Sequence, residues 1–237
     1  MNEPRAPIIE ASSLERRFGH LVALRSVDLR VGAGEVVLVA GPNGAGKSTL
    51  LRCLAGLARP TRGTVRIAGT PIRESPQSRS AVGFLSHQTL LYDDLTAREN
   101  LRFAATMHGL ESVEMRVVDA LNAAGLMQRA ETRAGVLSHG TRQRLSIARA
   151  TLHEPAALLL DEPFSGLDAA AAEQLRAGIA AHAGKGRAVV CVTHQPADIW
   201  PVATRVVVLN RGTVVVDAPR PATIEAFLAS YSGTIPA

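Results

Sequence analysis

A glycine-rich segment limits what this chain can fold into more than any other part of its sequence. It consists of Gly41, Pro42, Asn43, Gly44, Ala45, Gly46, Lys47, Ser48 and Thr49. Its spacing fits the pattern G-x-x-x-x-G-K-[ST]. The apolar run Val36–Ala40 before it indicates a buried strand, and residues 47–57 after it have leucines at helical spacing. Gly56 and Pro60 predict the end of that helix. A strand that leads through such a loop into a helix is typical of an α/β fold.

The glycines give this segment the chemistry of a phosphate-binding loop. Without Cβ atoms in the way, its backbone N–H groups can turn inward, and the helix that opens at Lys47 adds its positive dipole end. We expect Lys47 to reach the β- and γ-phosphates of a nucleoside triphosphate and the Ser48 hydroxyl to ligate Mg²⁺. A glycine-rich turn without a ligand is the alternative, but it does not account for the strand and helix on either side. The motif alone does not say which reaction follows.

Two adjacent carboxylates form a second candidate site. The apolar run 158–160 ends in Asp161 and Glu162, and α/β sheets bind ligands at the carboxyl ends of their strands. We expect Asp161 to hold Mg²⁺ directly or through water, and Glu162 to polarise an attacking water as a general base. A lone Asp-Glu pair is usually the solvated start of a loop. Its place behind an apolar strand, downstream of a phosphate-binding loop, favours the catalytic interpretation.

The order of strands and helices predicts a mostly parallel sheet covered by helices. Strand-like patterns occupy residues 8–31 (interrupted at 18–20), 36–40, 64–68, 157–160, 188–192 and 205–209. From about residue 96 to residue 152 only helical periodicity is present, which indicates a helical insertion. An alanine-rich helix is expected at 169–183, and a short helical pattern lies near 224–228.

Composition limits the location and the partners of the chain. Its 237 residues suit one core domain with an inserted subdomain. The apolar runs are far shorter than the ~20 residues of a membrane helix, and no signal-peptide pattern is present, so we expect membrane contact only through a partner. The formal charge of +5 is spread along the chain and does not indicate nucleic-acid binding. Cys53 and Cys191 lie in apolar segments and are expected to be buried thiols in a reducing compartment.

Further pieces stand in the order and spacing of the ABC ATPases, and residues 8–216 resemble that family. They are Phe18, Gln88, segment 137–144 with Ser138 and Gly140, segment 165–168 with Asp168, and His194. In the order of the chain they resemble the adenine-stacking aromatic, the Q-loop glutamine, the signature motif, the D-loop and the switch histidine. The signature departs from the family pattern at His139 and Thr141, which leaves the rate of hydrolysis open.

The resemblance implies a P-loop NTPase (RecA-like) core with an N-terminal antiparallel β subdomain and an inserted helical signature subdomain. One ABC ATPase domain is then expected over residues 1–237. Its parts are the core with the β subdomain at 1–88 and 153–220, the helical subdomain at 89–152 and a short C-terminal tail at 221–237.

The resemblance also implies roles on the nucleotide side of the site. Phe18 stacks on the adenine of ATP, and Gln88 joins Ser48 and Asp161 as a ligand of Mg²⁺ or of water. His194 donates to the charge of the transition state.

Other residues are implied to act between two copies of the chain. Ser138 and Gly140, at the start of a helix that Ser138 caps, contact the phosphates bound by the other copy, and Asp168 lies with them at the nucleotide. A homodimer is therefore expected, with each signature segment closing the other copy's ATP.

The type of transporter is indicated by segment 86–101, which resembles the ATPase subunits of the haem exporter of cytochrome c maturation (CcmA). This implies separate integral membrane subunits and a peripheral position on the cytoplasmic face of the inner membrane. The chain has no Cys-x-x-Cys-His, and its lone histidines, His87, His108 and His139 among them, do not indicate direct haem binding.

The alternatives are an exporter of another substrate, such as a drug or lipid, a soluble ABC ATPase of translation or DNA repair, and a P-loop kinase. The last two fit less well, because the chain has one cassette, no sustained heptad in the insertion, and a signature segment that a kinase would not explain.

Overall fold

A computed structural model describes residues 6–74, 76–86 and 89–234. The N-terminal part forms a four-stranded antiparallel sheet in the order β2-β1-β4-β5. Its strands are β1 (Ile9–Phe18), β2 (Leu21–Val31), β4 (Arg62–Ile67) and β5 (Thr70–Pro71). Ile9 is paired with Val31 on one side and with Ile67 on the other, so the buried faces of the three long strands are in register.

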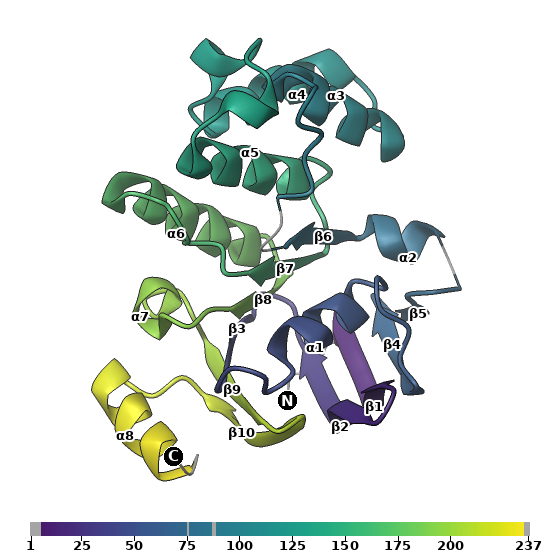
Figure 1. The fold of residues 1–237 in the computed structure, drawn as a ribbon, viewed down its shortest axis with the longest axis vertical. Helices are drawn as coiled ribbons and strands as arrows, with labels where there is room; N and C mark the ends of the chain where they lie inside the picture. Colours follow the sequence, from purple (N-terminus) through teal and green to yellow (C-terminus); the bar gives the residue numbers. More distant parts are fainter. Residues whose placement is uncertain (1–5, 75, 87–88, 235–237) are drawn as a thin grey trace.

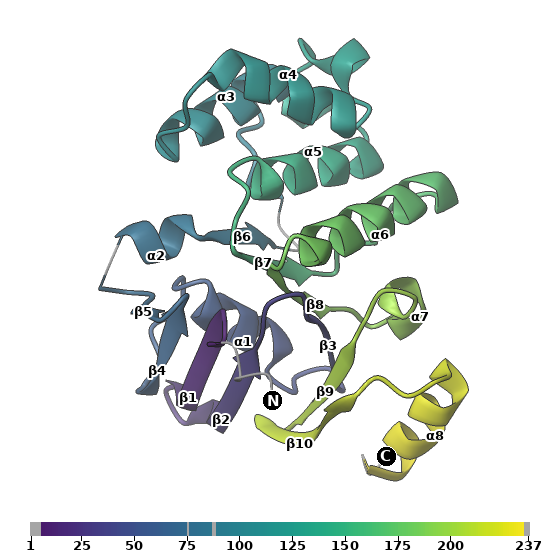
Figure 2. The same cartoon turned by 180° about the vertical axis from the view of Figure 1, so that it is seen from behind.

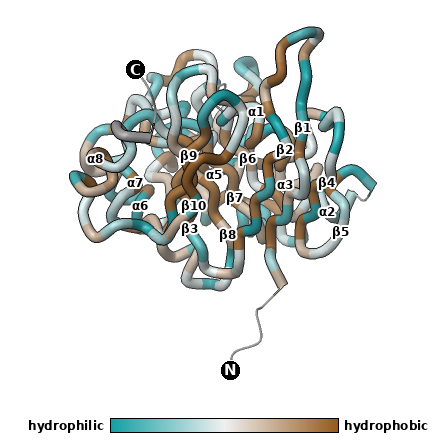
Figure 3. The backbone as a smooth tube through the Cα atoms, turned by 90° about the horizontal axis from the view of Figure 1, so that it is seen from below, coloured by the Kyte–Doolittle hydropathy of each residue, from teal (hydrophilic) through white to brown (hydrophobic). Residues whose placement is uncertain are grey.

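A second sheet of six strands has the order β10-β9-β3-β8-β7-β6. Its strands are β3 (Val36–Ala40), β6 (Val82–Leu85), β7 (Ala157–Asp161), β8 (Ala188–Val192), β9 (Arg205–Asn210) and β10 (Thr213–Pro219). All neighbours from β9 to β6 are parallel, and β10 is antiparallel to β9. Every residue of β3, β7 and β8 is buried, as expected for parallel strands covered on both faces. Figure 3 shows these strands as hydrophobic segments within a more polar periphery.

Some helices lie beside the two sheets, and others gather at one end of the molecule (Figures 1 and 2). They are α1 (Lys47–Leu54), α2 (Pro76–Ser80), α3 (Ala97–Met107), α4 (Val113–Ala123), α5 (His139–Thr151), α6 (Ala169–Gly184), α7 (Pro196–Ile199) and α8 (Ile224–Thr234), with short 3₁₀ turns at Met127–Arg129 and Ala134–Val136. Helices α3, α4 and α5 gather beyond β6 and β7, at the opposite end from β10. No helix in the described ranges is both long and apolar enough to span a membrane.

The buried apolar residues form separate clusters. One cluster packs α1 between the two sheets, through Leu50 and Leu54 of the helix. A second covers the other face of the six-stranded sheet and includes Ile179 of α6 and Trp200. A third, with Leu101, Leu121 and Leu145, lies within α3, α4 and α5. The domain boundaries expected at residues 88 and 152 stay a prediction.

The fold class is confirmed, and the differences concern the end of one helix and two strands at the edges of the sheet. The helix predicted over residues 47–57 ends at Leu54, because Gly56 takes a φ of +72° and the N–H groups of Leu57 and Ala58 turn back to the Arg52 carbonyl. The sequence pattern missed β6 and β10, which carry four and seven residues at the edges of the sheet. Cys53 and Cys191 are buried and free, as predicted, and burial raises the pKa of the Cys53 thiol to about 11.

Candidate nucleotide site

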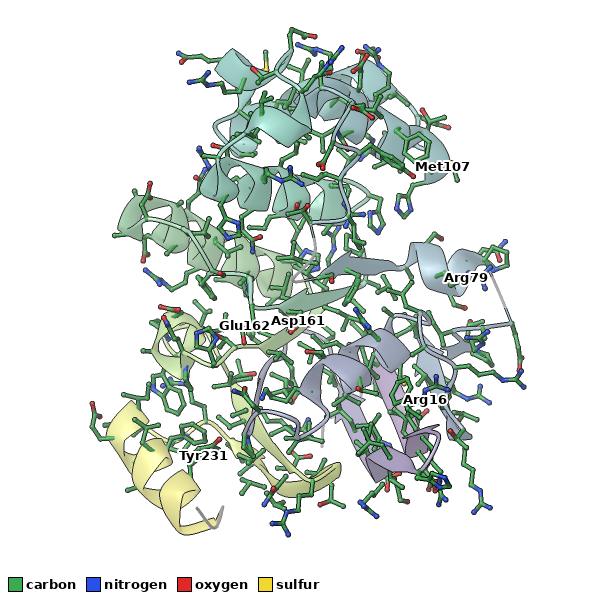
Figure 4. The ribbon with its side chains drawn as sticks, in the orientation of Figure 1. Arg16, Arg79, Met107, Asp161, Glu162 and Tyr231 are labelled. Atoms are coloured by element: carbon green, nitrogen blue, oxygen red, sulfur yellow. The ribbon has the colours of Figure 1, made fainter. Side chains whose placement is uncertain are left out.

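The candidate site lies where β3, β7 and β8 end at the same edge of the parallel sheet. Each of these strands is followed by a segment that was singled out in the sequence: the glycine-rich loop, the Asp161–Glu162 pair and His194. Figure 4 shows Asp161 and Glu162 side by side at the end of β7, near the middle of the molecule. The parallel sheet therefore gathers groups that are far apart in the chain.

Two glycines of the loop lie where no side chain fits. A Cβ on Gly41, which has a φ of +148°, would lie 2.2 Å from the Leu209 carbonyl oxygen. A Cβ on Gly46, with a φ of +103°, would lie 2.4 Å from the Ala23 carbonyl oxygen. The loop can therefore approach the backbone of β9 and β2 only with glycine at both positions. Gly46 is also the residue that precedes α1, so the N–H groups at the start of that helix face the loop.

The Lys47 side chain folds back over this loop. Its Nζ donates hydrogen bonds to the carbonyl oxygens of Gly41 (2.7 Å) and Pro42 (2.9 Å). Desolvation by burial lowers the pKa of Lys47, while the nearby carboxylates of Glu162 and Asp161 raise it in part. The ammonium group thus lies between the loop that is expected to hold phosphate and the acidic pair.

Ser48 and Asp161 provide oxygen ligands next to each other. The Ser48 hydroxyl lies 3.3 Å from Asp161 Oδ1, and Asp161 is buried. No group of three or more His, Cys, Asp or Glu side chains suited to a metal occurs in the described ranges. One carboxylate and one hydroxyl suit Mg²⁺, which usually completes its shell with phosphate oxygens and water rather than with a protein cage. This pair therefore fits a Mg²⁺ that arrives with a nucleotide.

Glu162 is held in a strained backbone conformation and contacts His194. Its φ is +52°, a left-handed value for a residue with a side chain, and its N–H donates to the Val192 carbonyl (2.9 Å). Its carboxylate accepts a hydrogen bond from the His194 backbone N–H (3.0 Å) and lies 2.8 Å from His194 Nδ1. This pairing joins the ends of β7 and β8 and fixes the direction of the carboxylate.

A buried glutamine that the sequence reasoning missed supports the same segment. Gln143 of α5 is 3% exposed, and its Nε2 donates to the carbonyl oxygens of Pro163 (2.9 Å) and Glu162 (3.3 Å). It lies within the candidate signature segment 137–144, and its position on a largely polar helix gave no sign that its side chain is buried. The helix that begins at Ser138 therefore positions the backbone of Glu162.

The first turn of α5 packs against segment 165–168 of the same chain. The Ser138 hydroxyl caps the helix by accepting from the Thr141 N–H, and it lies 2.8 Å from Thr141 Oγ1. A Cβ on Gly140 would lie 2.7 Å from the Gly166 carbonyl oxygen, and one on Gly166 would lie 2.0 Å from the His139 ring. His139 thus rests on a glycine, while Thr141 binds the capping serine. These contacts show how His139 and Thr141, the two departures from the family signature, pack within the folded chain.

The remaining predicted residues lie apart from this cluster or outside the described part. Phe18 ends β1 with 49% of its surface exposed, and the Arg16 guanidinium lies 4.4 Å from its ring centroid. Asp168 caps α6 by accepting from the Ala171 N–H (2.8 Å). Gln88 lies outside the described residues. Helix α5 lies on one side of β6 and β7, and α1, which the glycine-rich loop precedes, lies on the other (Figure 1).

Comparison with known proteins decides the family. The sequence profile described as "ABC transporter" matches residues 24–165, from β2 through Ser165. This chain belongs to the ABC transporter family. It is 37% identical over 235 residues to the sulfate/thiosulfate import ATP-binding protein CysA of Mycobacterium tuberculosis. That alignment covers 94% of this chain and 67% of the CysA protein. It is also 37% identical over 212 residues to the maltose/maltodextrin import ATP-binding protein MalK of Yersinia pestis. That alignment covers 87% of this chain and 57% of MalK.

Solved structures agree with the fold of the ABC chain. An ATP-binding subunit of an ABC transporter aligns with a TM-score of 0.87 at 29% identity, over 94% of this chain and 98% of that one. A dimeric ATP-binding cassette in a post-hydrolysis state, bound to ADP and Pi, aligns with a TM-score of 0.81 at 28% identity, over 91% of this chain and 100% of that one. The ABC chain is thus an ATP-binding ABC ATPase. The relatives are named as importers and lend no support to the haem-exporter resemblance.

Replacing Gln143 tests whether α5 positions Glu162. In Gln143→Leu, the Glu162 and Pro163 carbonyls lose their buried donor, and we expect kcat for ATP hydrolysis to fall by roughly tenfold or more. The KM for ATP should change little, because the phosphate-binding loop is untouched. Gln128→Leu, at an exposed glutamine, is the matched control. A fall in stability in urea with an unchanged kcat would show that Gln143 is only structural.

Proposed function

We propose that this chain is the ATP-hydrolysing subunit of an ABC transporter, in which Glu162 is the general base and two copies complete each active site. The observation that carries the proposal is the Glu162–His194 pair beside the phosphate-binding loop. The carboxylate is fixed by two hydrogen-bonding groups of His194, and Lys47 lies near enough to be influenced by its charge.

Each residue has a role that its position supports. The loop N–H groups and Lys47 bind the phosphates of ATP, and Phe18 offers an exposed ring for the adenine. Glu162 orients a water and accepts its proton at a carboxylate oxygen, while His194 keeps that carboxylate in place and supplies a donor to the developing charge. Mg²⁺, held by Ser48 and Asp161 and, as the family resemblance implies, by Gln88, would neutralise charge on the phosphate oxygens.

The Glu162→Gln variant tests the assignment of the base. Gln is nearly the same shape but does not accept a proton, so ATP binding should persist while hydrolysis falls by about 10²–10⁴-fold. Binding is measured with a fluorescent ATP analogue and hydrolysis by phosphate release. Glu173→Gln, at an exposed carboxylate on α6, should retain full activity. Near-normal turnover in the Glu162 variant would rule out this residue as the base.

A second copy of the chain supplies what one copy lacks. The phosphates bound by the loop need donors on their open side, because water otherwise occupies it. The exposed start of α5, with Ser138 as its cap, has free N–H groups and the positive end of a helix dipole, and α5 lies across β6 and β7 from the helix α1 that follows its own loop. A head-to-tail pair of copies lets each α5 face the other's ATP. The dimeric cassettes among the structural neighbours support this arrangement.

Mixing two inactive variants tests the composite site. Lys47→Ala and Ser138→Arg damage opposite halves, so a mixed dimer contains one site with both defects and one with neither. If subunits exchange at random, half of the dimers are mixed, and roughly a quarter of the wild-type rate should return. Lys47→Ala mixed with Glu162→Gln is the control, because both defects lie in the same half and every site stays damaged. Recovery in the control, or none in the first mixture, contradicts the composite site.

The membrane partner is expected to bind beside segment 90–103. A cleft of about 450 Å³ lies there, lined by Leu90, Leu91, Tyr92, Asn100, Phe103, Ala104, Met107, His108 and Arg149. Tyr92, Phe103 and Met107 are 54%, 43% and 71% exposed, more apolar surface than a solvated loop would carry. Arg142 of α5 pairs with Asp93 in this segment (2.7 Å), so contact with the partner can reach the signature helix. We place the chain peripherally, on the cytoplasmic face of the inner membrane.

Cysteine crosslinking tests this interface in the assembled transporter. Tyr92→Cys and Met107→Cys should crosslink to the membrane subunit, since both side chains are exposed beside the cleft. Val215→Cys on β10, at the far end of the molecule, should not. Cys53 and Cys191 are buried and leave the background low. Crosslinks from Val215→Cys alone would place the partner on the other face.

Two substrate classes are supported by different observations. Segment 86–101 supports haem export for cytochrome c maturation, whereas 37% identity to CysA and MalK supports import of a solute such as sulfate or a sugar. Deleting the gene should abolish mature c-type cytochromes but not b-type cytochromes if haem is exported. Normal c-type haem staining together with slow growth on sulfate or maltose would favour import, and it would leave the ATPase assignment intact.

A further inference from the structure

A second cleft, of about 430 Å³, lies between α6 and the helices α4 and α5, with β7 as its floor. Its lining is drawn from these three helices, from β7 and from the turns that flank them. None of the residues assigned to the nucleotide or to the membrane partner is in this lining. The cleft therefore has no role in the proposed function.

The cleft exists because the helices around it carry small residues. Alanines of α4 and α5 face Ala171, Gly178 and Ala181 of α6, and such side chains do not fill the space between helices. A Cβ built on Gly178 meets no atom within 4 Å, which shows how open this wall is. Leu158 and Leu160 of the floor are buried, but Ile147 and Leu167 of the walls are only half-buried, so the opening exposes an apolar surface that favours a ligand with an aliphatic chain.

One end of the cleft carries an excess of positive charge. Glu154 pairs with Arg187 (3.2 Å) and Lys185 (3.7 Å), so one carboxylate lies between two cations. An anionic head group therefore complements this rim.

A buried polar atom at the same end has no partner. His182 is 8% exposed, and its Nε2 has no hydrogen-bond partner. Burial, followed by the charges of Arg187 and Lys185, lowers the pKa of His182 to about 4, so its ring is neutral near pH 7 and the two cations lie close to it. An unsatisfied buried nitrogen beside an open cleft is met by a polar group of a ligand or by water that accompanies it.

We propose that this cleft binds a free fatty acid, with its aliphatic chain along the alanine-lined wall and its carboxylate beside Lys185 and Arg187. The half-buried apolar side chains of the walls account for the chain, and the positive rim accounts for the carboxylate. Binding would bridge α5, which begins at the signature segment, and α6, which begins at Asp168, so the ligand would fix the two helices relative to each other. The inference does not rest on ATP hydrolysis, and its test needs none.

The test measures dodecanoate binding to the full chain by calorimetry, below the concentration at which dodecanoate forms micelles. Gly178→Leu fills the cleft from an open position and should weaken binding by about tenfold or more. Gly184→Leu is the matched control, because it makes the same change in the same helix, also in open space, but outside the lining. Equal binding by wild type and Gly178→Leu would overturn the proposal.

The role of the rim is tested with a second variant and a neutral probe. Lys185→Gln should weaken dodecanoate binding by about 2–5-fold, as expected for a partly exposed ion pair. Dodecanol has the same chain without the charge, and its binding should be the same in wild type and in Lys185→Gln. Absence of dodecanoate binding, or a Gly178→Leu change that alters only self-association in gel filtration, would show that the cleft serves another occupant and that the proposal is wrong.

Discussion

The phosphate-binding loop holds its shape because it lies directly against the backbone of both sheets. Gly46 approaches the Ala23 carbonyl of β2, and Gly41 approaches the Leu209 carbonyl of β9. The turn after β9 completes this contact, since the Gly212 N–H donates to Ala45 (3.0 Å) and the Arg25 N–H donates to the Gly212 carbonyl (2.7 Å). Helix α1 then packs between the sheets through Leu50 and Leu54. Any side chain at either glycine would push the loop, and with it the start of α1, away from the acidic pair.

Helix α5 has a comparable place at the other end of the site. Its side chains reach in several directions: Gln143 to the backbone after Glu162, Arg142 to Asp93, and Arg149 to the Phe84 carbonyl. The same helix carries the candidate phosphate contacts at its N-terminus and packs into the cluster of α3 and α4. A rotation of this one helix would therefore change the surroundings of Glu162 and of the cleft near Tyr92 together.

The sequence predicted best those features that depend on neighbouring residues. The glycine-rich loop, the strand that ends in Asp161 and the cap at Ser138 are local patterns, and the structure has each of them where it was expected. Features that depend on distant pairs were not predictable. The Glu162–His194 contact spans two strands, Gln143 is buried only because α5 packs on segment 162–163, and His139 fits because a glycine, Gly166, faces it. The end of α1 was misplaced because leucine spacing continues through Leu57, while Gly56 already turns the chain. The residue roles stay predictions.

The separate apolar clusters have a consequence for how the molecule comes apart. Helices α3 and α4 bury their apolar residues only in the third cluster, whereas α5 also contributes Ala150 to the cluster on the sheet, so α3 and α4 can open without exposing the clusters on either face of the six-stranded sheet. Amide exchange in α3 and α4 should then be faster than in β3, β7 and β8, whose residues are all buried. Partial opening would uncover one face of the signature helix and leave the phosphate-binding loop folded. The protein would lose its ability to pair with a second copy before it lost its nucleotide.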